Sequence, residues 1–233
     1  MLMTILVVCV VSGALVLGAV WGIFGPLPKK VEGFLVALAG GALIVSAMSE
    51  LIEPALKQTS LLLVALSVFG GASLFVMADM LVGKTLGRDS GGGLLASITL
   101  DGIPENLALG VALIGAGPLQ VAALAGSIFL SNLPEAAGGA REMAKDRSKL
   151  QVMGLWAATA ALLSAAAVAG NLLLGGVGDT WLAVLRCVAA GAVIASLATA
   201  VFPKAYREGS YSAGIATAVG LLLALGLGQL GGG

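Results

Sequence analysis

The chain has 233 residues and a formal net charge of zero; it is 59% hydrophobic and only 10% charged, with a mean hydropathy of +1.07. Soluble domains carry about 25% charged residues, so this composition excludes an ordinary soluble domain. The few basic residues are scattered, which argues against nucleic acid as a partner. We predict an all-α, polytopic protein of the cell membrane, in contact with the lipid bilayer.

Apolar segments of about 20 residues cross a hydrocarbon core about 30 Å thick, and this chain has room for about eight of them. The predicted spans form a single transmembrane domain over residues 1–233. In chain order they are residues 3–24, 33–56, 60–82, 93–115, 118–141, 150–174, 181–203 and 211–230.

The basic residues predict the orientation. With eight spans and the N-terminus outside, the loops on one side hold ten of them, and the other side holds only Lys57 and Arg186. The ten are Lys29, Lys30, Lys84, Arg88, Arg141, Lys145, Arg147, Lys149, Lys204 and Arg207. Because cytoplasmic loops are enriched in Lys and Arg, both termini are expected outside.

A weak internal repeat relates the second and seventh spans. Residues 39–50 resemble residues 190–200, and a proline follows each segment, at Pro54 and Pro203. The two spans would run in opposite directions across the membrane. Inverted repeats are typical of secondary transporters, whose substrate sites lie near the midplane.

Two polar segments interrupt the fourth and fifth spans. Residues 101–106 read Asp-Gly-Ile-Pro-Glu-Asn, and residues 131–136 read Ser-Asn-Leu-Pro-Glu-Ala. Each places a polar residue at i, a proline at i+3 and a carboxylate at i+4. A charge in mid-bilayer costs at least ~2.5–3.5 kcal/mol, so such carboxylates are candidate functional residues.

The spacing predicts a shared cation site. Because residues at i and i+4 share a helix face, Asp101 and Glu105 form one edge, and Ser131 and Glu135 form another on the next helix. The short turn at residues 115–118 makes these helices antiparallel neighbours. Four side chains would then face one ion near mid-depth.

The two segments offer further oxygen ligands for a cation. Asn106 and Asn132 add amide oxygens. Pro104 and Pro134 each lack an N–H and free the carbonyl four residues earlier. Glu50, in the second span, is another candidate, with a protonated, hydrogen-bonded carboxyl as the alternative reading.

These segments resemble the ZIP (Zrt/Irt-like) family of divalent metal transporters. That family has eight spans, both termini outside, and a binuclear metal site built from His-Asn-x-Pro-Glu-Gly in span 4 and His-x-x-Pro-Glu in span 5. Residues 101–106 and 131–136 stand at these places. Residues 41–52 resemble the family's second helix, residues 189–194 its seventh, and Asp79 the acid near the end of its third.

The departures from the family's pattern affect the ligands. Asp101 and Ser131 replace both histidines, Gly102 replaces the span 4 asparagine, and Ala200 stands for the span 7 acid. The ligands that the resemblance implies for the first metal are Asp101, Glu105, Ser131 and Glu135. A second, bridged metal would retain only Asn132 of its other usual ligands, so we expect one metal.

The predicted function is a ZIP-like transporter that carries a divalent metal cation toward the cytoplasm through a carboxylate site on helices 4 and 5. The family implies Zn²⁺, Fe²⁺ or Mn²⁺, whereas oxygen ligands suit harder cations; the chain contains no histidine, so we expect Mn²⁺ or Fe²⁺ to be preferred to Zn²⁺. The cation would be a substrate, with no cofactor, and a homodimer is possible.

Two alternatives stay open at this point. One is a transport-incompetent homologue that senses cations or acts as a scaffold. Another is a proton-coupled carrier of small organic solutes, which the acidic interior disfavours for anions. An enzyme is not expected, because the sequence shows no nucleophile–base pair and no histidine–glutamate metal motif.

Overall fold

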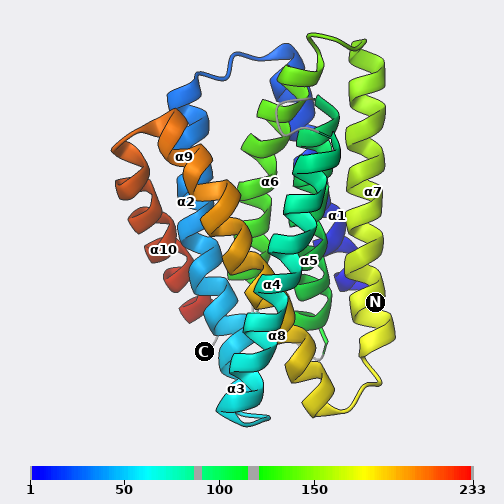
Figure 1. The fold of residues 1–233 in the computed structure, drawn as a ribbon, viewed down its shortest axis with the longest axis vertical. Coiled ribbons are helices and arrows are strands. Elements are labelled where there is room, and N and C mark those ends of the chain that lie inside the picture. The colour runs from blue at the N-terminus through cyan, green and yellow to red at the C-terminus, as the bar shows by residue number, and fades with distance from the viewer. Residues whose placement is uncertain (1, 87–90, 115–120, 232–233) are drawn as a thin grey trace.

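The computed structural model describes residues 2–86, 91–114 and 121–231 (Figure 1). Within these ranges the chain is helical and contains no strand, which confirms the all-α prediction. The elements in chain order are α1 (Leu2–Phe24), α2 (Lys29–Ser46), the π-helix η1 (Ala47–Ile52), α3 (Glu53–Leu56), α4 (Leu61–Leu86), α5 (Gly91–Ala112), α6 (Ala122–Met143), α7 (Lys149–Leu174), α8 (Asp179–Ser196), the π-helix η2 (Leu197–Val201), α9 (Phe202–Gly209) and α10 (Ser212–Gly231).

Six helical stretches of the described chain are long and apolar enough to cross a membrane. They include α1, α4, α7 and α10, together with two longer rods in which α2 continues through η1 into α3 and α8 continues through η2 into α9. Helices α5 and α6, which are not among these six stretches, carry the two carboxylate segments. The predicted turn between α5 and α6, at residues 115–118, lies outside the described residues.

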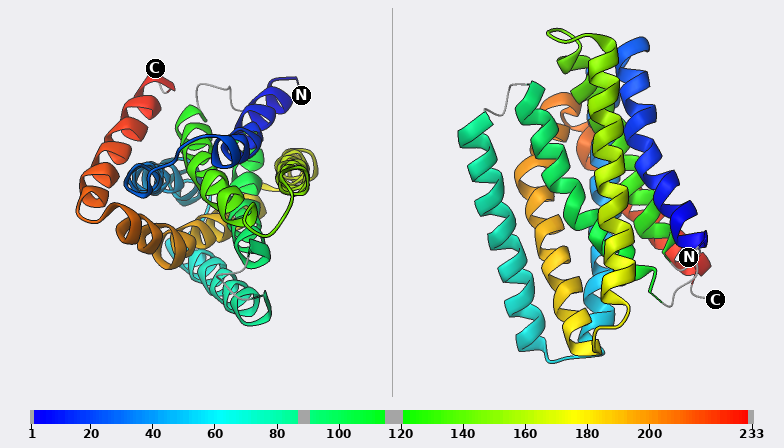
Figure 2. Two further views of the ribbon diagram at one scale, coloured as in Figure 1. Left: turned by 90° about the horizontal axis from the view of Figure 1, so that it is seen from above. Right: turned by 90° about the vertical axis from the view of Figure 1, so that its right-hand side faces the viewer.

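The helices run up and down between two ends of the bundle (Figures 1 and 2). Both termini lie at one end, called here the terminal end, together with the α3–α4 and α7–α8 connections. The α1–α2 and α6–α7 connections and α9 lie at the other end. We call it the basic end, since most of the chain's lysines and arginines lie there.

The helices pack in reciprocal pairs. On one side α1 packs against α6 and α2 packs against α10, whereas on the other side α7 packs against α5 and α8 packs against α4. The central helices α5 and α6 also contact each other. The two halves of the chain, α1–α4 and α7–α10, thus make matching contacts around α5 and α6.

Glycines at matching positions let these pairs approach closely. A Cβ at Gly41 would overlap the Thr217 carbonyl oxygen on α10, and a Cβ at Gly191 would overlap the Val68 carbonyl oxygen on α4. Small residues at such crossings bring helix backbones together, which increases van der Waals contact.

The two segments that resemble each other in sequence also share a local structure. In both, an α-helix widens into a π-helix just before a proline, with η1 preceding Pro54 and η2 preceding Pro203. A wider turn accommodates a proline, which cannot donate a hydrogen bond and crowds the preceding carbonyl. The sequence predicted the similarity of these segments but not their π-helical form.

The close approach between helices predicts the effect of adding one methyl group. We expect Gly41→Ala and Gly191→Ala each to destabilise the protein by roughly 1–3 kcal/mol, because the new Cβ has to displace a backbone carbonyl. Thermal unfolding in detergent measures this effect. Gly214→Ala is the matched control, since nothing lies within 4 Å of that position; equal melting temperatures for all three variants would contradict the packing.

Candidate functional site

The polar residues of the two carboxylate segments are buried between the central helices. All six are at most 9% exposed. They are Asp101, Glu105 and Asn106 on α5 and Ser131, Asn132 and Glu135 on α6. The structure therefore places every predicted ligand of these two segments inside the bundle.

The carboxylates of the two helices are electrostatic neighbours. Glu105 interacts with both Glu135 and Asp101. Within the described ranges neither Glu105 nor Glu135 forms a salt bridge. Like charges in a low-dielectric interior repel one another, so a cation placed between them would be strongly stabilised.

The arrangement is not a preformed cage. Among the described residues, no group of three or more Asp, Glu, Cys or His side chains is close enough to hold a metal ion. A bound cation would therefore have to draw α5 and α6 side chains inward, or complete its shell with hydroxyl, amide and carbonyl oxygens.

Spare hydrogen-bonding capacity lies beside the two glutamates. Asn106 Nδ2 donates to the Gly102 carbonyl at 2.9 Å, and Asn106 Oδ1 has no hydrogen-bond partner in the described part of the chain. The same holds for Asn132 Nδ2. The Ser131 hydroxyl donates to the Ile128 carbonyl at 3.1 Å, which leaves its lone pairs to accept. Buried polar atoms without partners are uncommon and call for a ligand or water.

Both motif prolines lie inside helices that continue past them, Pro104 in α5 and Pro134 in α6. Each frees one carbonyl of the turn that precedes it. An apolar cavity of about 300 Å³ adjoins Pro104 between α4, α5 and α8. None of the candidate ligands lines it, so this cavity is not the candidate site.

Glu50 lies in different surroundings. It is half-buried in η1, where the Ser49 hydroxyl donates to Glu50 Oε1 at 3.5 Å. Its charged neighbours are Arg186 and Glu53, rather than the carboxylates of α5 and α6. The structure therefore does not group Glu50 with the other predicted ligands.

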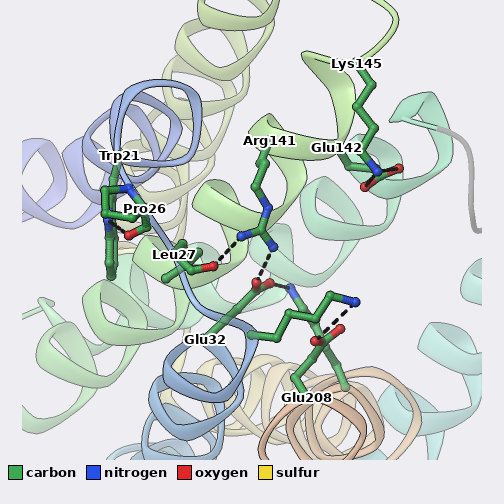
Figure 3. A network of polar contacts seen from close by, with 10 residues as sticks. Trp21, Pro26, Leu27, Glu32, Arg141, Glu142, Lys145 and Glu208 are labelled. Carbon is green, nitrogen blue, oxygen red and sulfur yellow. Dashed lines mark hydrogen bonds and ion pairs between the residues drawn. The ribbon is translucent and has the colours of Figure 1, made fainter.

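The structure reveals one polar cluster that the sequence did not predict (Figure 3). Glu32, at the start of α2, is 3% exposed and forms ion pairs with Arg141 and Lys204. These residues were assigned to loops or span ends. The sequence signal that could have found this cluster is the glycine pair at residues 138–139, which ends two residues before Arg141, because helices can approach closely at such a pair.

Gly102 lies in close contact with α7. A Cβ at Gly102 would overlap Leu163 Cδ1 on α7, and Leu163 is fully buried. An asparagine cannot occupy position 102 unless Leu163 moves. This chain therefore combines a glycine on α5 with a large side chain on α7.

No protein-family model matches the chain, and no curated protein matches it significantly in sequence.

The contact between Gly102 and Leu163 predicts a non-additive pair of substitutions. Gly102→Asn should lower the melting temperature through overpacking, and Leu163→Ala should lower it by leaving a cavity. The double variant should lose less stability than the sum of the two, by about 1 kcal/mol or more, because the cavity receives the asparagine. Thermal unfolding of the four proteins tests this, and strict additivity would show that the two positions do not compete for space.

Proposed function

We propose that this protein is a divalent metal cation transporter of the ZIP type, with α5 and α6 holding the cation. The observation that carries the proposal is the pair of buried carboxylates, Glu105 and Glu135, which interact across two adjacent helices at the centre of the bundle. A cation between them would offset a burial that is otherwise unfavourable.

The architecture supports eight membrane crossings in this proposal. Helices α5 and α6 have 22 residues each, which corresponds to about 33 Å and is enough to cross the hydrocarbon core. They lie among the apolar helices, so their polar side chains face protein instead of lipid. The basic end would face the cytoplasm and both termini the outside.

The reciprocal packing of the two halves supports alternating access as the transport mechanism. Helices α2 and α8 run in opposite directions and make matching contacts with α10 and α4. Inverted repeats of this kind allow one half to rock against the other around a fixed site. Both carboxylate helices lie where the two halves meet.

The donor set supports a preference among metals. Carboxylate, hydroxyl and amide oxygens suit Mn²⁺ or Fe²⁺ better than Zn²⁺, which favours imidazole and thiolate. The chain has no histidine, and its two cysteines, Cys9 and Cys187, lie on α1 and α8, away from the carboxylate segments.

A second candidate function is a cation sensor or scaffold that does not transport. One specific observation favours it: no group of three or more metal-binding side chains is assembled among the described residues. Reversible binding without flux would distinguish this function from transport.

Flux measurements test the transport proposal. We expect Mn²⁺ uptake into proteoliposomes to fall about 10–100-fold in Glu105→Gln and Glu135→Gln, because each removes a charged ligand while retaining side-chain size. Glu142→Gln is the control on α6, since its side chain is 44% exposed and pairs with Lys145. Flux that survives both ligand substitutions would remove the proposed site, and binding without flux in the unsubstituted protein would favour the sensor.

Competition between metals tests the proposed donor set. We expect Mn²⁺ to be displaced by Fe²⁺ at similar concentrations and by Zn²⁺ only at higher ones, because the site offers oxygen ligands. Displacement of bound radioactive Mn²⁺ from purified protein measures the order. Zn²⁺ binding tighter than Mn²⁺ by about tenfold would contradict this preference.

A further inference from the structure

At the basic end of the bundle, the buried Glu32 carboxylate forms ion pairs with Arg141 and Lys204, a cluster that we call the Glu32 clamp. Glu32 on α2 accepts from Arg141 Nη2 on α6, at 2.9 Å, through Oε2. Lys204 Nζ on α9 lies 3.0 Å from Glu32 Oε1. Arg141 also donates to the Leu27 carbonyl in the α1–α2 connection (Figure 3). One carboxylate thus holds three separate elements together.

The clamp is enclosed by close packing. The Glu32 carboxylate occupies the space that a side chain at Gly138 would need, and Lys204 Nζ lies 3.3 Å from the same Cβ position. Next to it, a Cβ at Gly33 would overlap the backbone at Gly209. These glycines bring α2 against both α6 and α9, so the Glu32 side chain is only 4% exposed.

The clamp lies next to the candidate cation site. On α6, Gly138 lies three residues after Glu135 and three residues before Arg141, so it is a helical neighbour of both. Besides Glu105, the charged neighbours of Glu135 are Lys204 and Glu32. The clamp therefore stands between Glu135 and the basic end.

The terminal end has a different chemistry at the matching positions. When α2 and α8 are aligned at Gly41 and Gly191, Leu182 of α8 takes the position of Glu32. When α6 and α5 are aligned at their motif prolines, Val111 of α5 takes the position of Arg141. Both matching residues are buried and apolar. The two halves therefore pack in the same way, but they differ in chemistry. The basic end has an ion-pair cluster where the terminal end has apolar contacts.

We propose that the Glu32 clamp is the gate at the basic end of the transport pathway. Lys204, held at Glu32 beside Glu135, is the internal cation that stands where the cargo has to pass. A cation leaving Glu135 toward the basic end would meet an ammonium and a guanidinium, so release requires α9 to separate from α2 and α6. This inference rests on the proposed transport function, since it assigns a gate to the same site.

The physical basis of the gate is the interdependence of its three charges. The Glu32 side chain is only 4% exposed, whereas the side chains of Arg141 and Lys204 are 35% and 24% exposed. Removing Glu32, or one of its two cations, unbalances this enclosed group and destabilises the closed arrangement more than loss of an exposed pair would. Lys29 and Glu208 provide the comparison, because they also join α2 to α9, at 3.9 Å, but the Lys29 side chain is 76% exposed.

Thiol labelling tests the gate without any metal. The reporter is Ser131→Cys in a background with Cys9→Ala and Cys187→Ala, reconstituted in vesicles with a membrane-impermeant thiol reagent added at the basic end. We expect slow labelling of the reporter protein and about tenfold faster labelling after Glu32→Gln or Lys204→Gln, because the closed arrangement loses a buried partner. Lys29→Gln and Lys145→Gln are the matched controls and should label as slowly as the reporter protein.

The charge-conserving variant Lys204→Arg separates gating from loss of folding. It should label as slowly as the reporter protein, because a cation still faces Glu32 beside Arg141. Equal labelling rates in clamp variants and controls, or fast labelling of the reporter protein itself, would overturn the gate. This outcome is independent of the flux test. If substitution of Glu105 and Glu135 leaves the flux unchanged, the proposed transport site is wrong. If substitution of Glu32 and Lys204 leaves the labelling rate unchanged, only the gate is wrong.

Discussion

The structure depends on the burial of two carboxylates, Glu105 and Glu135, between the central helices of an apolar bundle. Two such groups in electrostatic contact are unfavourable when ionised, unless a cation or a proton balances them. The surrounding helices keep both side chains away from lipid, and close helix contacts at glycines such as Gly41 and Gly191 hold the surrounding helices in place. The rest of the fold can be understood as the packing that keeps this pair enclosed.

The reciprocal packing and the Glu32 clamp together give the bundle a direction. The two halves of the chain make matching contacts around α5 and α6, and both contain a π-helical widening before a proline. Only one of the matching ends, however, places a buried glutamate between two cations. An alternating-access transporter needs two ends that open at different times, and a difference in chemistry between equivalent positions provides one means of achieving this.

The all-α fold and the burial of the polar residues on α5 and α6 followed from the sequence, because hydropathy and turn residues indicate where apolar helices begin and end. The α5 and α6 segments were found because a carboxylate in an apolar run is conspicuous. The π-helices were missed, because Pro54 and Pro203 are equally compatible with an ordinary helix end. The burial of Glu32 was missed because it depends on three helices that meet at Gly138. The residues around Glu32 in the sequence do not indicate that contact.

The most direct test of the account is the position of a bound metal. Anomalous diffraction from crystals grown with Mn²⁺ should show a peak between α5 and α6, at about 2.0–2.6 Å from carboxylate oxygens of Glu105 and Glu135. The peak should disappear in the Glu135→Gln protein. A well-ordered Mn²⁺ elsewhere in the bundle, with no density between these two glutamates, would contradict the account.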